Sequence, residues 1–196
     1  MLGVTFRELG AAGSEASLPR ATFPELVRRA AVAARTVRSG PADLNWVREI
    51  LTPEEHDLWS RQSPFDQDHG VQVARRVERR LATTRHANDP RWIGAALMHD
   101  VGKTQAGLTP LERALATVVG RIVGLEAARR WAAGRGLRSR IGAYLTHGEI
   151  GARMIRAAGG RPEIAAWAEV HQSPHGAVRL GIPQDVVDAL LESDVA

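Results

Sequence analysis

Residues 92–103 read WIGAALMHDVGK and contain the adjacent pair His99-Asp100, from which the fold and the function of this chain are inferred. The residues before the pair are mostly apolar and predict the end of a buried helix. Neighbouring side chains on a helix point in different directions, so both face one point only where the helix ends, and Gly102 favours such an end. A buried carboxylate needs a partner, and a carboxylate beside an imidazole suits a first-row divalent metal. We therefore expect His99 and Asp100 to bind metal, with the two oxygens of Asp100 able to bridge two ions.

The sequence on both sides of this pair has helical periodicity almost throughout. Four predicted helix starts share a capping residue that is followed by proline, and two of them form complete capping boxes with a later glutamate. These starts are Thr52-Pro53, Ser63-Pro64, Asp89-Pro90 and Thr109-Pro110. Later helices are predicted over 139–145, 149–158, 162–171 and 183–193. No segment alternates with a period of two, so the predicted fold class is all-α.

The length of 196 residues and the 44% hydrophobic content suit a single core. Residues 41–196 are predicted to form one helical metal-binding domain, and residues 1–40, which include a predicted helix over 23–37, are expected to be a helical extension of it. The sequence shows neither an apolar run of spanning length nor a secretory signal, so we expect a cytoplasmic protein without membrane contact. Cysteine is absent, which excludes disulfides, thiolate nucleophiles and cysteine-ligated metal sites.

The charge pattern bears on the class of partner. The formal net charge is +4, and Lys103 is the only lysine among 26 basic residues. The arginines are scattered, and the alternating run over 75–80 predicts a solvated helix face, so nucleic acid is not an expected partner. Lys103 follows Asp100 by three residues, which places the one lysine beside the predicted metal site.

Further residues of ligand type stand at intervals along the chain. In order they are His69, the pair with Gly102-Lys103 after it, His147 with Gly151 four residues later, His171 and Asp194. This ordered series resembles the HD-domain metal-dependent phosphohydrolase superfamily over roughly residues 63–196. The resemblance implies an HD-domain-like helical bundle around a buried metal centre.

The resemblance also implies a ligand set. His69, His99, Asp100 and Asp194 would bind one divalent ion, and His147 and His171 would add a second, with Asp100 as the bridge. Iron, manganese and magnesium are the expected cofactors. If Asp194 does not serve, Asp188 is the fallback.

The expected activity is hydrolysis of a phosphate ester or anhydride in a phosphorylated small molecule, nucleotide-like in kind, because two ions can stabilise the charge on phosphoryl oxygens. Asp100 and Lys103 are the candidate catalytic residues. The candidate substrate-binding residues are Lys103, Arg75, Arg153 and His175.

Two alternatives fit the same residues. The first is a di-iron oxygenase of the HD type, which uses the same six ligands, and the second is a regulatory or binding module that retains metal without turnover. The sequence leaves the substrate, the native metal and the oligomeric state open.

Overall fold

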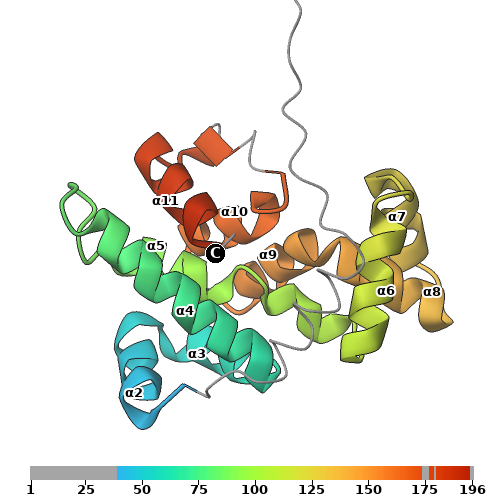
Figure 1. Ribbon diagram of the computed structural model, residues 1–196, viewed down its shortest axis with the longest axis horizontal. Coiled ribbons are helices and arrows are strands. Elements are labelled where there is room, and N and C mark those ends of the chain that lie inside the picture. The colour runs from blue at the N-terminus through green and yellow to red at the C-terminus, as the bar shows by residue number, and fades with distance from the viewer. Residues whose placement is uncertain (1–38, 174–176, 179, 195–196) are drawn as a thin grey trace, which may run out of the picture.

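The computed structural model describes residues 39–173, 177–178 and 180–194, and every regular element within these ranges is a helix (Figure 1). The predicted all-α class is therefore confirmed. The elements are α2 (Pro41–Ile50), α3 (Pro53–Ser60), α4 (Pro64–Leu81), α5 (Pro90–Met98), η1 (Val101–Gln105), α6 (Pro110–Gly120), α7 (Leu125–Ala132), α8 (Gly136–Leu145), α9 (His147–Ala157), α10 (Pro162–Val170) and α11 (Gln184–Asp194).

The predicted cap-and-proline signals lie at helix starts. Thr52 and Thr109 each accept a hydrogen bond from the backbone of the glutamate three residues later, and that glutamate bonds back to the cap, so both capping boxes are present. Ser63 and Asp89 cap α4 and α5 through their side chains. A backbone N–H in the first turn of a helix has no partner within the helix, and proline has no N–H to leave unpaired. Proline therefore favours the start of each of these helices.

The helices gather around two hydrophobic clusters. The main lobe consists of α2–α5 and α9–α11, and its core includes Val77, Leu97, Ile155 and Leu190. The small lobe consists of α6–α8, which stand together at one side of the molecule in Figure 1. Its core is made by a separate cluster of Ala106, Leu108, Ala116 and Ile141. η1 packs against both α8 and α9 and so lies where the two lobes meet.

A buried ion pair fixes the start of α10 against α3. The Glu55 carboxylate is 0% exposed and accepts hydrogen bonds from the Arg161 backbone N–H at 2.8 Å and from Arg161 Nε at 3.0 Å. The same carboxylate accepts from the Thr52 N–H at 3.0 Å, so one side chain closes the α3 capping box and holds α10. Because His171 directly follows the last residue of α10, this contact helps to place a predicted metal ligand.

Residues 1–38 lie outside the described part of the chain, so the predicted extension and its helix over 23–37 stay predictions. Among the described residues, no helix combines the length and the apolar character that crossing a bilayer requires.

Candidate metal centre

Three histidines stand at helix C-termini that point to one place. His99 and His171 are the C-cap residues of α5 and α10, and His147 directly follows Thr146, the C-cap residue of α8. The peptide dipoles of a helix leave partial negative charge at its C-terminus, so the ends of α5 and α10 favour a cation between them, whereas His147 also begins α9, whose N-terminus carries partial positive charge.

The same three imidazoles share one orientation. In each, Nδ1 lies 2.6–2.8 Å from the backbone carbonyl oxygen three residues earlier. A carbonyl oxygen only accepts hydrogen bonds, so Nδ1 must carry the proton and donate it. When Nε2 carries no second proton, its lone pair faces the centre, which is the state required of a metal ligand.

Two more helices complete one group of candidate ligands. His69 on α4 and Asp194 at the end of α11 face each other, with His69 Nε2 3.0 Å from Asp194 Oδ1. His99 Nε2 lies 3.5 Å from the same oxygen. The three ligand atoms are all within 4.8 Å of one another, close enough to hold one ion.

The second group lies directly beside the first. His147 Nε2 and His171 Nε2 lie 3.0 and 3.7 Å from Asp100 Oδ1, and these ligand atoms also fall within 4.8 Å of one another. The other carboxylate oxygen, Asp100 Oδ2, is 3.3 Å from His99 Nε2 of the first group. The structure thus brings all six predicted ligands together, with Asp100 between the two groups.

Charge in the centre also suits cations. Burial raises the pKa of Asp100, but the positive charges of His99 and Lys103 outweigh burial and hold that pKa well below its usual range. Burial lowers the pKa of His99, yet Asp100 and Asp194 outweigh it and raise the pKa to about 10. Burial and the charges of His99 and His147 lower the pKa of His171 to about 3. The carboxylates therefore remain ionised and hold positive charge beside them, and nitrogen and oxygen donors of this kind fit first-row divalent ions.

Two glycines allow the backbones around the centre to approach. A Cβ on Gly102 would lie 2.0 Å from the carbonyl oxygen of His147, so η1 contacts α9 only because this residue is glycine. A Cβ on Gly148 would lie 2.7 Å from the Ala168 carbonyl oxygen, so α9 approaches α10 this closely only because residue 148 is glycine. These contacts set how far Asp100 is from the histidines of the second group.

The predicted phosphate-binding residues have different positions. Lys103 Nζ contacts Asp100 Oδ2, and its side chain is 17% exposed. The Arg75 guanidinium lies 3.5 Å from the Trp46 ring centroid and 3.2 Å from Asp43, so it joins α4 to α2, and its role in the substrate site stays a prediction. Arg153 is exposed on α9. Arg153 follows His147 by six residues on the same helix, so its side chain is turned about 120° from that of His147, away from the ligands.

Two further predicted residues lie in the C-terminal part of the chain. His175 lies outside the described residues, so its role in the substrate site stays a prediction. The fallback ligand Asp188 is exposed, and its carboxylate bonds to Gln184 on the same helix at 2.8 Å. Asp194, by contrast, lies among the candidate ligands.

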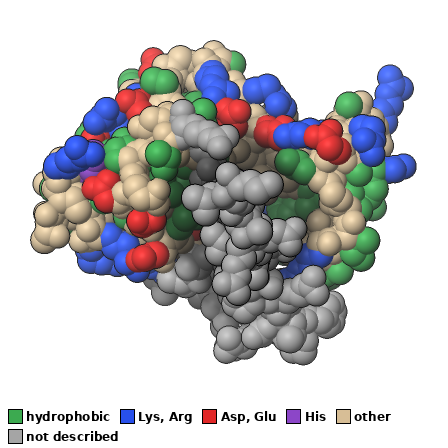
Figure 2. Space-filling view, turned by 90° about the horizontal axis from the view of Figure 1, so that it is seen from above, with side chains coloured by type: hydrophobic (Ala, Val, Ile, Leu, Met, Phe, Trp, Pro, Cys, Tyr) green, Lys and Arg blue, Asp and Glu red, His purple; other side chains and the backbone are tan. Residues whose placement is uncertain are grey.

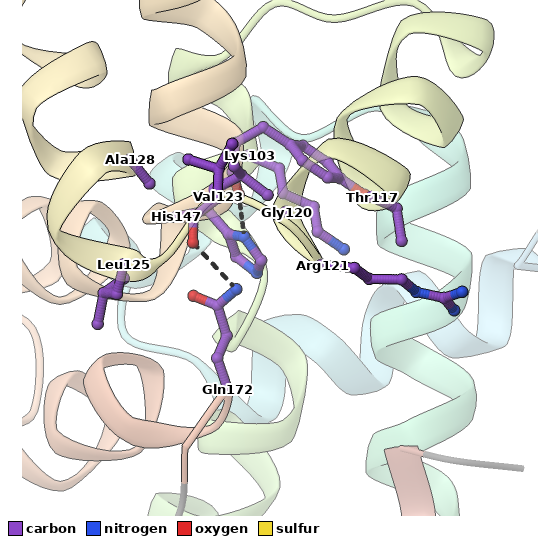
Figure 3. A pocket seen from close by; sticks show the side chains of 11 residues that line it. Lys103, Thr117, Gly120, Arg121, Val123, Leu125, Ala128, His147 and Gln172 are labelled. Carbon is purple, nitrogen blue, oxygen red and sulfur yellow. Dashed lines mark hydrogen bonds between the residues drawn. The ribbon is translucent and has the colours of Figure 1, made fainter. Parts of the chain in front are cut away.

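A cleft of about 360 Å³ opens beside the second group (Figure 3). Lys103, His147 and Gln172 point toward it, and the small lobe supplies apolar residues on its other wall. Those apolar residues are Val123, Leu125, Ala128 and Leu145. The sequence interpretation missed Gln172, whose amide oxygen accepts from the Gly148 N–H at 3.2 Å and whose amide nitrogen reaches the Leu145 carbonyl at 3.4 Å. Its position directly after His171 was the only available signal.

Comparisons with protein-family models, with curated proteins and with solved structures find no match. The resemblance to HD-domain phosphohydrolases therefore depends on the order of the ligand residues in the sequence. The convergence of these residues in space is an independent observation, made from distances alone.

Proposed function

We propose that this protein is a metal-dependent phosphohydrolase, which cleaves a phosphate ester or anhydride of a nucleotide-like small molecule at a centre for two divalent cations. The observation that carries the proposal is the position of Asp100, whose Oδ1 faces His147 at 3.0 Å and whose Oδ2 faces His99 at 3.3 Å. A carboxylate shared by two ligand groups would hold two ions side by side, as a two-metal site for phosphoryl transfer does.

The donor set assigns a group of three ligands to each ion, and Asp100 belongs to the second group and faces the first. His69, His99 and Asp194 would hold one ion, and His147 and His171 would hold the other together with Asp100. When bound, the two ions would draw charge from the phosphoryl oxygens and acidify a water molecule. The backbone carbonyls that receive Nδ1–H of His99, His147 and His171 keep these rings aimed at the centre.

Lys103 supplies a charge at the mouth of the centre. Its ammonium carries three donor hydrogens, and Asp100 accepts from it. The side chain also lines the cleft, so the remaining donors are available to a phosphate oxygen that enters there. The organic part of the substrate would then lie on the apolar wall formed by Val123, Leu125 and their neighbours.

The test compares metal-free protein with protein reloaded with Mn²⁺, Fe²⁺ or Mg²⁺. Phosphate or p-nitrophenol release is measured with p-nitrophenyl phosphate, bis(p-nitrophenyl) phosphate and a nucleotide panel, in air and without oxygen. We expect metal-dependent hydrolysis at equal rates with and without oxygen. The isosteric variant Asp100→Asn should lose more than about 100-fold, because even groups that only orient a metal ligand contribute 10–100-fold.

Asp188→Asn is the matched control, since it removes an equal charge from an exposed position on α11. It should retain the parental rate. Turnover that requires oxygen would identify the oxygenase alternative instead, and metal binding without any turnover would identify the binding module. Equal activity of Asp100→Asn and the parent would overturn the proposal.

A further inference from the structure

The hairpin of α7 and α8 is the most basic described stretch outside the metal centre. Residues 129–140 read RRWAAGRGLRSR, with five arginines, one tryptophan and no acidic residue. The sequence interpretation treated all arginines as scattered surface charges, like those of the run over 75–80, and did not single out this stretch. In space, however, the hairpin residues surround a cleft.

We call this the arginine cleft, a hollow of about 690 Å³ on the outer side of the small lobe. It is lined by Ile122, Val123, Gly124, Ala127, Arg130, Trp131, Gly134, Arg135 and Arg138. Figure 2 shows Lys and Arg side chains beside hydrophobic ones at the right-hand end of the molecule, the end that α7 and α8 occupy in Figure 1. A cleft with these linings offers both cationic and apolar contacts to one ligand.

Three arginines line the arginine cleft, namely Arg130, Arg135 and Arg138. Their ion-pair partners differ from those of the other two arginines of the hairpin. Arg129 is paired with Glu149 at 2.6 Å and with Glu126, and Arg140 is paired with Glu112 at 3.2 Å. Within the described part of the chain, the three cleft arginines form no ion pair with a carboxylate. Three guanidinium groups that share a cleft without carboxylates repel one another, and a polyanion removes that repulsion.

An aromatic surface lies among these charges. The guanidinium carbon of Arg138 lies over the Trp131 ring, 4.5 Å from its centroid, which is a cation–π contact. Ile122 at the cleft edge is 84% exposed. Guanidinium and aromatic planes bind nucleic-acid bases without sequence preference, since every base has a π face.

We propose that the arginine cleft binds single-stranded nucleic acid, with backbone phosphates on Arg130 and Arg135 and a base on the Arg138–Trp131 pair. A pocket for a free nucleotide encloses most of its ligand and carries precisely placed polar groups. The three arginines here are all exposed, as expected for a surface along which a strand lies. This binding activity goes beyond the proposed hydrolysis, although Val123 lines both the arginine cleft and the cleft beside the metal centre.

The test measures fluorescence anisotropy of a 5′-labelled twelve-residue oligothymidylate with the full chain in EDTA. The triple variant Arg130→Gln, Arg135→Gln, Arg138→Gln should bind at least about tenfold more weakly. The plot of log K against log salt should lose about 1.4 units of slope, at about 0.7 for each of the two phosphate contacts on a single strand.

A second triple variant serves as the control, because it removes the same charge from exposed positions outside the cleft. One of these positions is on α2, one is near the end of α4, and one follows α4. This variant consists of Arg48→Gln, Arg79→Gln and Arg85→Gln. This control should stay within about twofold of the parent, since scattered charges share no cleft. Thermal melts followed by circular dichroism establish that both variants are folded.

Three results would overturn the proposal. The first is equal weakening in the two triple variants, which would mean a general effect of net charge. The second is equally tight binding of an abasic strand of the same length, which would exclude stacking. The third is competition by ATP as strong as that by oligothymidylate at equal phosphate concentration, which would identify a free nucleotide. Asp100→Asn should bind the strand like the parent, so a failure of the hydrolysis proposal is distinguishable from a failure of this one.

Discussion

Replacing Glu55 by glutamine tests the contact that holds α10, and with it His171, against the rest of the main lobe. The change keeps the shape of the side chain and removes its charge. The Glu55 carboxylate is fully buried and accepts from the backbone of Thr52 and from the backbone and side chain of Arg161. In the variant, the Arg161 guanidinium loses its counter-charge while it remains packed.

Breaking a buried ion pair by removal of one partner costs about 3–5 kcal/mol. The Arg161 side chain keeps 20% exposure and a hydrogen bond from its NH2 group to the Ile50 carbonyl at 2.9 Å, so the lower end applies. We expect a loss of about 3 kcal/mol in the free energy of unfolding. For a chain of this size, this corresponds to a melting temperature lower by about 6–12 °C.

The assay is thermal and urea unfolding, with Glu54→Gln as the control, because Glu54 is an exposed neighbour of equal charge. Burial raises the pKa of Glu55, but the hydrogen bonds and charge of Arg161 and the bond from Thr52 outweigh burial and lower it. A carboxyl with a lowered pKa in the folded state stabilises the protein above its unfolded pKa of 4.5 and loses that effect as the pH falls further. The gap between parent and variant should therefore close in acid. Equal melting temperatures of Glu55→Gln and Glu54→Gln at pH 7 would refute the reasoning.

Further changes test the centre itself. His69→Ala and His171→Ala each remove one ligand from a different group. Each variant should therefore bind one ion where the parent binds two, as measured by mass spectrometry. Loss of both ions in each variant would contradict separate groups. Gly102→Ala should destabilise the fold by about 1–3 kcal/mol through its clash with α9, whereas Gly124→Ala, whose Cβ meets open space, should have a smaller effect in the same melts. Lys103→Gln should keep both ions and raise KM for the phosphate ester by about tenfold, since a charge-assisted contact is worth roughly 1.5–3 kcal/mol; an unchanged KM would remove Lys103 from the substrate site.

Helix starts were predictable because their signals are local. A capping side chain and the proline after it act within one turn, so Thr52, Ser63, Asp89 and Thr109 were recognisable without tertiary information. Helix ends were harder. After Thr109 apolar residues recur as far as Val123, a pattern that predicts a helix to Gly124, yet α6 ends at Gly120. Periodicity alone does not mark where a turn interrupts an apolar pattern.

The ligand residues were predictable as an ordered series, but their convergence depends on tertiary packing. Nothing in the sequence around His147 or His171 shows that both face Asp100 Oδ1. Arg75 was predicted at the substrate site as a nearby arginine that could offset phosphate charge. Its partners on α2, Trp46 and Asp43, are distant in sequence and redirect it.

The two clefts were not predictable for a related reason. Each is lined by residues from separate elements, and whether an arginine has a carboxylate partner depends on the fold. Arg129 and Arg130 are neighbours in the sequence, yet one has two glutamate partners and the other lines the arginine cleft. Composition gave the charge of the hairpin but could not divide its arginines into these two classes.

The central claim is that Asp100 joins two groups of ligands into one centre for two divalent cations. Anomalous X-ray diffraction at the manganese edge, from crystals of the Mn²⁺-loaded protein, tests it most directly. The account predicts two peaks about 3.5–4 Å apart, one beside each oxygen of the Asp100 carboxylate. One peak would lie among His69, His99 and Asp194, and the other between His147 and His171. A single peak, or peaks that do not share Asp100, would contradict it.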